Sequence, residues 1–402
     1  MPFDDRLQAI IAHAYANAPA FKKMMDGAGL SPADIQSYRD LPKLPVTTKE
    51  QLLEMQRENP PFGGWLAVPP ETVEHVFVSP GPLFEPEGAD FPEEWRSEVF
   101  AELGIGRGDI VFNTFMYHLT PAGLRLDAAV RATGATVVPT GPGNTEYQVE
   151  IMLKLGATGY VGTPSFLKIL FEKAAEMGIP AEKIPVKKAL FTAEPYPPSL
   201  RTYFEDGFGM RTAQTYATAE LGIIAYDTGG EPGMKLSKTM IVEIADPATG
   251  QPVPPGEPGQ VVVTNFNRTY PMIRLGTGDL SALVGEPDAD GYYWRIKGWM
   301  GRVGDAVKVR GMFLHPVQLK SAAAKFPQLG AVQAVITRPD TRDHLRVRVE
   351  LVGDTTDRAA LAEEFRAAVS AACRLRVDVV ELVSPGEIDP TARVVLDERT
   401  WE

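Results

Sequence analysis

The chain has 402 residues, with 40 Lys and Arg against 52 Asp and Glu, so its formal net charge is −12. A hydrophobic content of 44% with 23% charged residues is typical of a globular protein, and one domain per about 150 residues predicts two or three domains. The acidic balance argues against non-specific binding to nucleic acid or to anionic membrane surfaces. The single cysteine, Cys373, excludes an intrachain disulfide and a Cys-rich zinc site.

The first residues lack the basic-then-apolar layout of a signal peptide, and no apolar run approaches the ~18 residues of a membrane span. We therefore expect a soluble, cytoplasmic protein.

The N-terminal region is predicted to be helical, with prolines between the helices. Apolar residues at helical spacing, among them Leu7, Ile10 and Ala14, predict a helix within the first 25 residues. Ser31 followed by Pro32 predicts a helix start, the prolines of 41–45 predict a loop, and 47–53 opens another helix.

From about residue 108, short apolar runs alternate with helical stretches. The runs 109–115, 136–139, 159–162 and 188–192 are predicted strands, and 121–133, 145–156, 164–178 and 197–207 are predicted helices. This alternation predicts a parallel or mixed sheet with helices on both faces.

From 240 to 300 the predicted elements are hairpin strands separated by Pro/Gly turns. The runs are 240–245, which has a period-two alternation, 260–265 and 292–296. The order then becomes strand 305–310, helix 316–325, strands 331–337 and 345–352, helix 357–372 and strand 376–382. We expect an α/β protein with a large N-terminal domain over 1–302 and a small α+β domain over 303–402.

The segment from Gly301 to Pro316 concentrates glycines and basic residues at this predicted junction. Arg302 could hold a ribose or a phosphate, because a guanidinium presents fixed, paired donors. Gly311 would let the backbone approach a ligand closely. The alternative interpretation is a basic strand and turn on a solvated surface.

The junction segment resembles the domain-junction motif of the adenylate-forming superfamily of acyl-CoA synthetases. Further landmarks of that superfamily follow the same order: Thr192-Ala-Glu-Pro195, Tyr216-Ala-Thr-Ala-Glu220, Gly256-Glu-Pro-Gly-Gln-Val-Val-Val263 and Leu275-Gly-Thr-Gly-Asp279. The segments 6–21, 41–49, 61–69, 142–146 and 162–165 narrow the resemblance to the phenylacetate–CoA ligase family.

The resemblance implies an adenylate-forming fold with a mobile C-terminal domain, and it implies roles for individual residues. Glu220 would bind magnesium and, with Arg302, act in catalysis; Asp279 would bind the ribose hydroxyls, and Asp305 would be the hinge. The nucleotide side would comprise Ala193, Glu194, Pro195, Tyr216, Asp279 and Arg302. The substrate and CoA side would comprise Tyr117, His118, Asn144, Thr145, Gly162, Thr163, Pro164, Lys308 and Gly311. A structural role for His118 is the alternative at that position.

Two departures from the family pattern concern the use of ATP. In the phosphate-binding loop, here Ser79 to Pro86, Glu85 stands in the place of the family's lysine. Replacing a cation by an anion beside a triphosphate reverses a Coulomb energy of roughly 1–4 kcal/mol at about 4 Å. Near the C-terminus, Thr391 stands in the place of a lysine that attends adenylation, and a positioned donor of that kind contributes roughly 3–4 kcal/mol.

The sequence thus predicts an acyl- or aryl-acid CoA ligase of the AMP-forming type. The expected cofactors are magnesium and ATP or AMP, with coenzyme A as co-substrate and no zinc. One alternative is an ATP-independent enzyme that transfers, cleaves or hydrolyses an acyl-CoA or acyl-adenylate. Another is a catalytically silent protein that binds acyl-CoA or a nucleotide. The expected partner is a small carboxylic acid or acyl-CoA, with no nucleic acid or membrane, and a homodimer would suit the family.

Overall fold

The computed structural model describes residues 3–79, 83–89, 95–305, 307–310, 312–338, 343–355, 357–373 and 375–399. Two compact units are present: an N-terminal unit of Met1–Thr277 and Ser281–Trp299, and a C-terminal unit of Gly278–Leu280 and Met300–Glu402. The short segment 278–280 belongs to the C-terminal unit because Leu280 exchanges backbone hydrogen bonds with Met300 and Gly301.

The N-terminal helices are α1 (Asp4–Asn17), α2 (Pro19–Gly27) and α3 (Lys49–Glu58). The single helix predicted for the first 25 residues is interrupted at Ala18, because a residue before proline disfavours the helical conformation and Ala18 is extended. The helix start predicted at Ser31 is a single 3-10 turn over Pro32–Asp34, and the predicted proline loop holds a second one over Tyr38–Lys43.

The larger sheet has the strand order β14-β10-β9-β8-β7-β6-β4-β5. Its parallel part comprises β4 (Ile110–Asn113), β5 (Thr136–Pro139), β6 (Gly159–Gly162), β7 (Lys188–Phe191) and β8 (Arg211–Thr218). Its antiparallel part comprises β9 (Gly222–Asp227), β10 (Met234–Leu236) and β14 (Arg295–Ile296).

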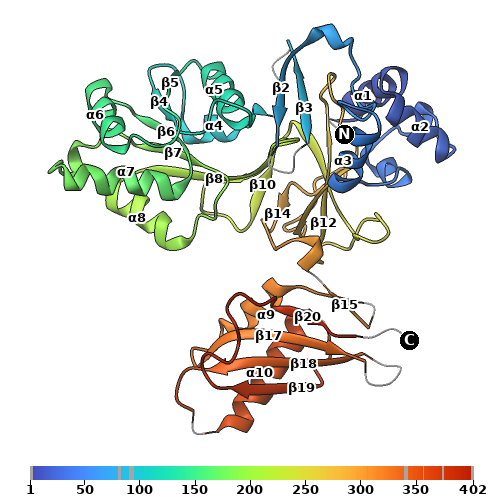
Figure 1. Cartoon of the computed structure of the whole chain (residues 1–402), viewed down its shortest axis with the longest axis vertical. Coiled ribbons are helices and arrows are strands. Elements are labelled where there is room, and N and C mark those ends of the chain that lie inside the picture. Colours follow the sequence, from blue (N-terminus) through green and yellow to red (C-terminus); the bar gives the residue numbers. More distant parts are fainter. Residues whose placement is uncertain are drawn as a thin grey trace. The chain divides into compact units, whose positions relative to one another are not determined.

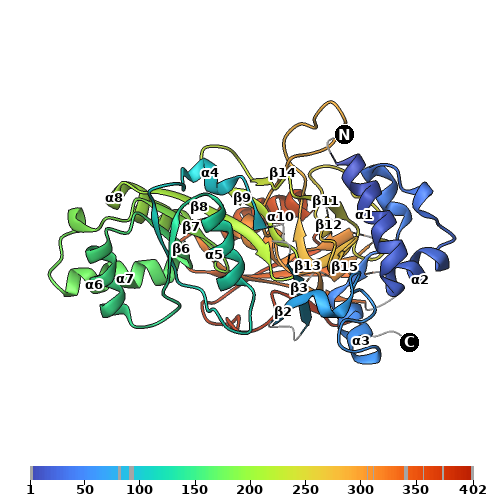
Figure 2. The ribbon, with the colours of Figure 1, turned by 90° about the horizontal axis from the view of Figure 1, so that it is seen from above.

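Helices cover both faces of this sheet, as the sequence predicts (Figures 1 and 2). On one face, α4 (Val99–Leu103) and α5 (Ala122–Ala132) pack with Val111, Val161 and Leu190. On the other, α6 (Thr145–Leu155), α7 (Pro164–Glu176) and α8 (Pro198–Phe208) pack with Phe112, Tyr160 and Phe191. Neighbouring residues of β4 thus enter opposite cores, as the period of a strand requires.

A second sheet has the order β1 (Thr47–Thr48), β13 (Leu275–Ser281), β12 (Gly259–Asn265) and β11 (Met240–Ala245). A separate hairpin pairs β2 (Val73–Val78) with β3 (Phe84–Gly88). The predicted strand 240–245 is present as β11, and its period-two alternation does not mark a solvated face, because every residue of β11 is buried. Its charged member, Glu243, forms a buried ion pair with Arg274.

The C-terminal unit contains α9 (Pro316–Ala323), α10 (Arg358–Cys373) and a sheet of order β19-β18-β17-β20. The strands of that sheet are β17 (Leu329–Thr337), β18 (His344–Leu351), β19 (Val379–Val383) and β20 (Val395–Asp397), and a separate hairpin pairs β15 (Val307–Val309) with β16 (Met312–Leu314). The predicted strand and helix order is present, with β16 and β20 in addition. Cys373 is buried in the core of this unit.

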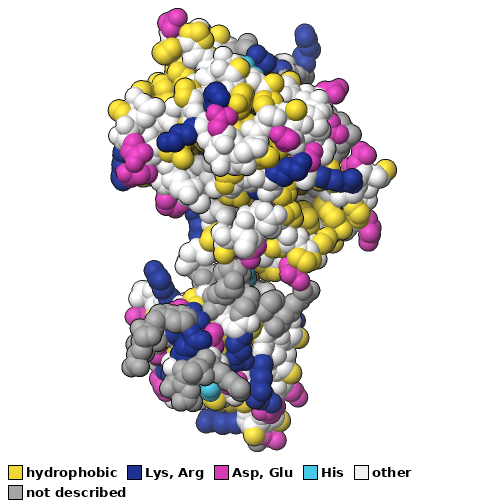
Figure 3. Space-filling view, turned by 90° about the vertical axis from the view of Figure 1, so that its right-hand side faces the viewer, with side chains coloured by type: hydrophobic (Ala, Val, Ile, Leu, Met, Phe, Trp, Pro, Cys, Tyr) yellow, Lys and Arg dark blue, Asp and Glu magenta, His cyan; other side chains and the backbone are white. Residues whose placement is uncertain are grey.

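Within the described ranges, no helix is both long enough and apolar enough to cross a membrane. On the face that Figure 3 shows, Lys and Arg side chains are interspersed with Asp and Glu side chains.

Candidate functional site

The parallel strands bring most of the predicted site residues of the N-terminal unit to one edge of the large sheet. Because β5, β4, β6, β7 and β8 run in the same direction, their carboxyl ends lie at a common edge, where α/β proteins bind ligands. The residues that follow these ends are Tyr117 and His118 after β4, Asn144 and Thr145 after β5, Thr163 and Pro164 after β6, Ala193, Glu194 and Pro195 after β7, and Glu220 after β8.

The segment after β7 is exposed and has an unusual backbone. Ala193 has a φ of 70°, in the left-handed region that residues with a side chain rarely adopt. Such conformations concentrate at ligand sites, where surrounding structure enforces them. The carboxylate of Glu194 accepts a hydrogen bond from the Ser165 backbone N–H at 3.4 Å, which ties this segment to the start of α7.

Tyr216 lies on β8, immediately before an irregularity in the pairing with β9. Bulges of this kind redirect side chains next to ligand sites. The Tyr216 hydroxyl donates to Thr277 Oγ1 at 3.1 Å, and Thr277 donates to the carbonyl of Val261 at 3.1 Å. The phenol is therefore anchored on the second sheet.

Gly162 and Thr163 have clear local structural roles. A Cβ at Gly162 would lie 2.1 Å from Thr114 Oγ1 and 2.3 Å from the Tyr160 hydroxyl, so only glycine fits at this end of β6. The Thr163 side chain caps α7 by accepting from the Phe166 N–H at 3.3 Å, and Pro164 occupies the first turn of that helix.

The remaining substrate-side residues differ in exposure. Tyr117 is half-buried, and its hydroxyl donates to Asp127 at 2.9 Å; burial and this carboxylate raise the pKa of the Tyr117 phenol. His118 is exposed. Asn144, in a left-handed conformation with φ of 49°, precedes the first residue of α6, Thr145.

In the C-terminal unit, Asp279 and Arg302 form an ion pair with Nε–Oδ1 at 3.0 Å. Asp279 is buried, whereas the Arg302 side chain is 61% exposed, so the carboxylate is held while the guanidinium can still reach a ligand. Asp305 ends a 3-10 turn and Lys308 lies on β15, but their side chains, like Gly311 as a whole, lie outside the described residues.

Beside Glu220 the structure reveals a group that the sequence analysis missed, which we call the charged cluster. Its members are Lys49, Glu85, Glu87, Arg125 and Glu220. Lys49 Nζ donates to Glu220 Oε2 at 2.8 Å, and the Glu220 side chain is only 5% exposed.

Arg125 ties the rest of the charged cluster together. Its Nε donates to Glu87 at 2.7 Å, and its Nη1 lies 3.4 Å from Glu85 and 2.9 Å from the carbonyl of Ala219, the neighbour of Glu220. Burial, with a smaller contribution from Glu220, raises the pKa of Glu85 to about 8. The signal that could have identified Arg125 is a charge on the apolar face of α5, between Gly123 and Leu126.

Comparison with known proteins supplies the family. The sequence profile described as AMP-binding enzyme matches residues 101–267, and the one described as AMP-binding enzyme C-terminal domain matches 311–399. A phenylacetate-coenzyme A ligase from Aromatoleum evansii is 30% identical over 360 residues, which cover 86% of this chain and 80% of the relative. The chain belongs to the phenylacetate–CoA ligase family.

Two further comparisons agree with this assignment. A phenylacetate-coenzyme A ligase from Thermus thermophilus is 29% identical over 87% of this chain and 80% of its own length. The structure of a 2-hydroxyisobutyryl-CoA ligase, in an open conformation with 2-HIB-AMP and CoA, superimposes with a TM-score of 0.83 at 27% identity. The match covers 98% of this chain and 90% of the ligase. The chain thus has the adenylate-forming fold of enzymes that join acids to the thiol of CoA.

The family implies magnesium at Glu220, but the donor set here does not fit a resident magnesium ion. Magnesium requires oxygen ligands, of which carboxylates are the protein's usual contribution. Glu220 already accepts from Lys49, and the neighbouring Glu85 lies against Arg125. In the part of the chain that is described, no three His, Cys, Asp or Glu side chains are grouped so as to hold a metal.

Thr391, which stands in the place of the family's C-terminal lysine, has an uncharged side chain. Its backbone N–H and its hydroxyl both bond to Asp389 Oδ1, at 2.8 and 2.7 Å. This segment is an exposed polar turn.

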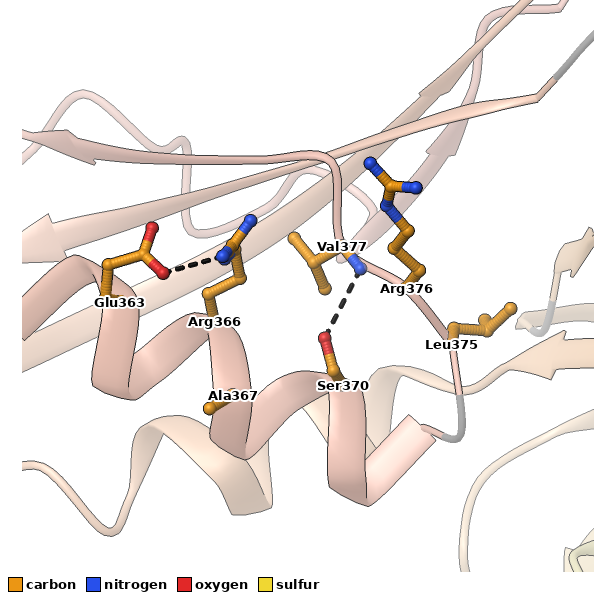
Figure 4. Close-up of a pocket in the computed structure, with 7 residues that line it drawn as sticks. All are labelled: Glu363, Arg366, Ala367, Ser370, Leu375, Arg376 and Val377. Carbon is orange, nitrogen blue, oxygen red and sulfur yellow. Dashed lines mark hydrogen bonds and ion pairs between the residues drawn. The ribbon is translucent and has the colours of Figure 1, made fainter.

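At least two hollows in the described part of the chain lie apart from the predicted residues. One, of about 230 Å³, is lined by Tyr38, Glu243 and Tyr292 among others in the N-terminal unit. The other lies beside α10 (Figure 4), where Arg366 pairs with Glu363 and Ser370 Oγ accepts from the Val377 N–H. Neither contains a predicted site residue.

Proposed function

We propose that this chain makes or processes a CoA thioester of a small carboxylic acid through an acyl-adenylate. The observation that carries the proposal is the convergence of Ala193–Pro195, the start of α7 and Glu220 at one edge of the parallel sheet. The family relationship supports it, since the related 2-hydroxyisobutyryl-CoA ligase was solved with 2-HIB-AMP and CoA.

Each group of residues has its own role in binding the acyl-adenylate. The exposed segment Ala193–Pro195 presents backbone groups to an adenine ring, and the anchored ring of Tyr216 contacts the same adenine. Asp279, held by Arg302, accepts hydrogen bonds from the two ribose hydroxyls, because an ionised carboxylate can accept from both at once. The segments that begin with Tyr117, Asn144 and Thr163 line the acyl side.

In the thioester-forming step, the thiol sulfur of CoA attacks the carbonyl carbon of the acyl-adenylate. The C–S bond forms and the bond between that carbon and the phosphate oxygen breaks. AMP departs with the electron pair, and the thiol proton passes to water. Arg302, exposed over most of its side chain, is the cation that would stabilise the departing phosphate.

The test is product analysis by mass spectrometry in two reactions. The first contains ATP, magnesium, CoA and a panel of aryl and short acyl acids; the second contains preformed phenylacetyl-adenylate and CoA without ATP. Thioester in either reaction supports the proposal. In the matched variant D279N the yield of thioester should fall. If neither reaction yields thioester, and neither AMP nor the adenylate binds, the proposal is wrong.

A further inference from the structure

The charged cluster has no cation left for an incoming phosphate chain. Lys49 is bonded to Glu220, and Arg125 is shared by Glu85, Glu87 and the carbonyl of Ala219. Two cations thus face three carboxylates, so the cluster as a whole has no positive excess.

The strand that carries Glu85 is fixed in this arrangement. The buried side chain of Gln56 donates to the carbonyl of Phe84 at 2.8 Å and accepts from the N–H of Phe84 at 2.9 Å. Gln56 and Lys49 are seven residues apart on α3 and so lie on one face of that helix. The same helix therefore holds both β3 and Glu220.

Arg125 is equally fixed. Its side chain is 4% exposed, and its guanidinium lies 5.0 Å from the ring centre of Phe77 and 5.9 Å from that of Trp95. Glu85 lies opposite Phe77 in the β2–β3 hairpin, so the ion pair is enclosed by the rings and strands beside it. Releasing Arg125 toward a phosphate would leave the buried Glu85 and the partly buried Glu87 without this partner, which is unfavourable.

We propose that the charged cluster replaces the magnesium–triphosphate subsite, so that this chain accepts AMP or an acyl-adenylate and excludes magnesium-bound ATP. The inference rests on the proposed function and specialises it to the thioester-forming step and its reversal. Three observations support it: Lys49 is bonded to the carboxylate that would bind a divalent cation, Glu85 supplies no cation where a triphosphate needs one, and Thr391 adds no positive charge.

The charges of the ligands explain the discrimination. An acyl-adenylate carries one negative charge on its phosphate, whereas ATP brings a triphosphate chain that needs cationic partners and magnesium. A second reaction, in which another enzyme activates the acid with ATP, would then have to supply the adenylate. Alternatively, the chain would form it from an acyl-CoA and AMP.

The test is isothermal titration calorimetry on the full-length chain with three probes. These are AMP, a phenylacetyl sulfamoyl-adenosine that mimics the adenylate, and ATP with saturating magnesium chloride. We expect AMP and the mimic to bind, and ATP to bind at least ~10-fold more weakly than AMP, with no effect of magnesium on AMP binding. ATP binding as tight as AMP binding, or release of pyrophosphate in the presence of acid, would overturn the inference while leaving the proposed function intact. If no probe binds, the proposed function itself fails, and the inference with it.

A charge-exchanged variant tests the cause. E85K/R125A places a cation on β3 and removes the buried arginine, and we expect it to gain ~10-fold in affinity for magnesium-bound ATP. The control, E54K/R57A, makes the same change of net charge at an exposed ion pair on α3 and should leave ATP affinity unchanged. Equal gains in both variants would contradict a local role for the cluster. Circular dichroism shows whether E85K/R125A folds, and if it does not, the titrations of the unaltered chain decide.

Discussion

Replacing Arg125 by methionine would test how strongly the charged cluster depends on its central cation. Methionine keeps much of the side-chain length, so the packing near Phe77 and Trp95 is largely retained. What is removed is the counter-charge of Glu85 and Glu87 and the donor to the carbonyl of Ala219. R125M thus isolates the electrostatic role.

The expected loss in the free energy of unfolding is about 3–5 kcal/mol, because breaking a buried pair leaves an uncompensated charge. Since burial raises the pKa of Glu85 to about 8, that carboxyl is largely protonated below pH 8, so the loss at neutral pH lies at the lower end of the range. The control is R131M on the same helix, where the arginine is 63% exposed and paired with Asp127. An exposed pair of this kind contributes about 0.5 kcal/mol or less.

The assay is equilibrium unfolding in urea, followed by tryptophan fluorescence, which includes the signal of Trp95 in the N-terminal unit. The double variant E85Q/R125M should lose less than the sum of its two single variants, because each removes the partner of the other. If R125M and R131M unfold at the same urea concentration, the cluster is not the enclosed ion pair described above and the reasoning fails.

Three further predictions concern single positions. G162A should cost about 1–3 kcal/mol in thermal unfolding, since its Cβ would lie 2.1 Å from Thr114 Oγ1, whereas G207A, with open space around it, should cost nothing. An unchanged melting temperature for G162A would contradict the close approach. Burial lowers the pKa of His315 from 6.5 to about 4. Between these pH values the unfolded chain binds a proton at this histidine and the folded chain does not, so the free energy of unfolding falls as the pH drops from 6.5 towards 4. The contribution of His315 is at most about 1.4 kcal/mol per pH unit. H315N should remove this contribution, and parallel curves of unfolding free energy against pH for H315N and the unaltered chain would refute the prediction. D279N should weaken AMP binding ~10-fold in calorimetry with little change in the melting temperature, and an unchanged affinity would exclude a ribose contact.

Most of the parallel sheet could be predicted because β4, β5, β6 and β7 are short apolar runs with helical stretches between them. The predicted strand 109–115 contains β4, and the predicted helix 164–178 contains α7. The strand β8 was missed because Arg211–Thr218 is rich in polar residues, whose burial depends on neighbouring strands that sequence periodicity does not reveal. The strand β3 was missed for the same reason: its glutamates are stabilised in a strand by Arg125, which lies beside them but is distant in the sequence.

The candidate site was predictable where local motifs determine it and not where distant residues meet. The segments after β6, β7 and β8 are continuous motifs, and the topology alone then brings them to one edge. Lys49 and Glu220 are 171 residues apart, and Arg125 is 40 residues from Glu85, so neither contact follows from spacing. The placement of the nucleotide-side residues and of the hinge at Asp305 stays a prediction for the titrations above to test.

The departure at Glu85 has a different meaning once its surroundings are known. Considered alone, a carboxylate in the place of a phosphate-binding lysine is a defect that repels the ligand. In the folded chain the Glu85 carboxyl is buried against the guanidinium of Arg125, which limits how far burial raises the pKa of that carboxyl. The guanidinium also bonds to the backbone beside Glu220, so the same pair that removes a cation from the phosphate side helps to hold the neighbouring acid in position. A site that had simply lost its lysine would leave a gap that an added cation could fill. Here the position is already occupied by an internal ion pair, and both of its members must change before a triphosphate can gain a counter-charge.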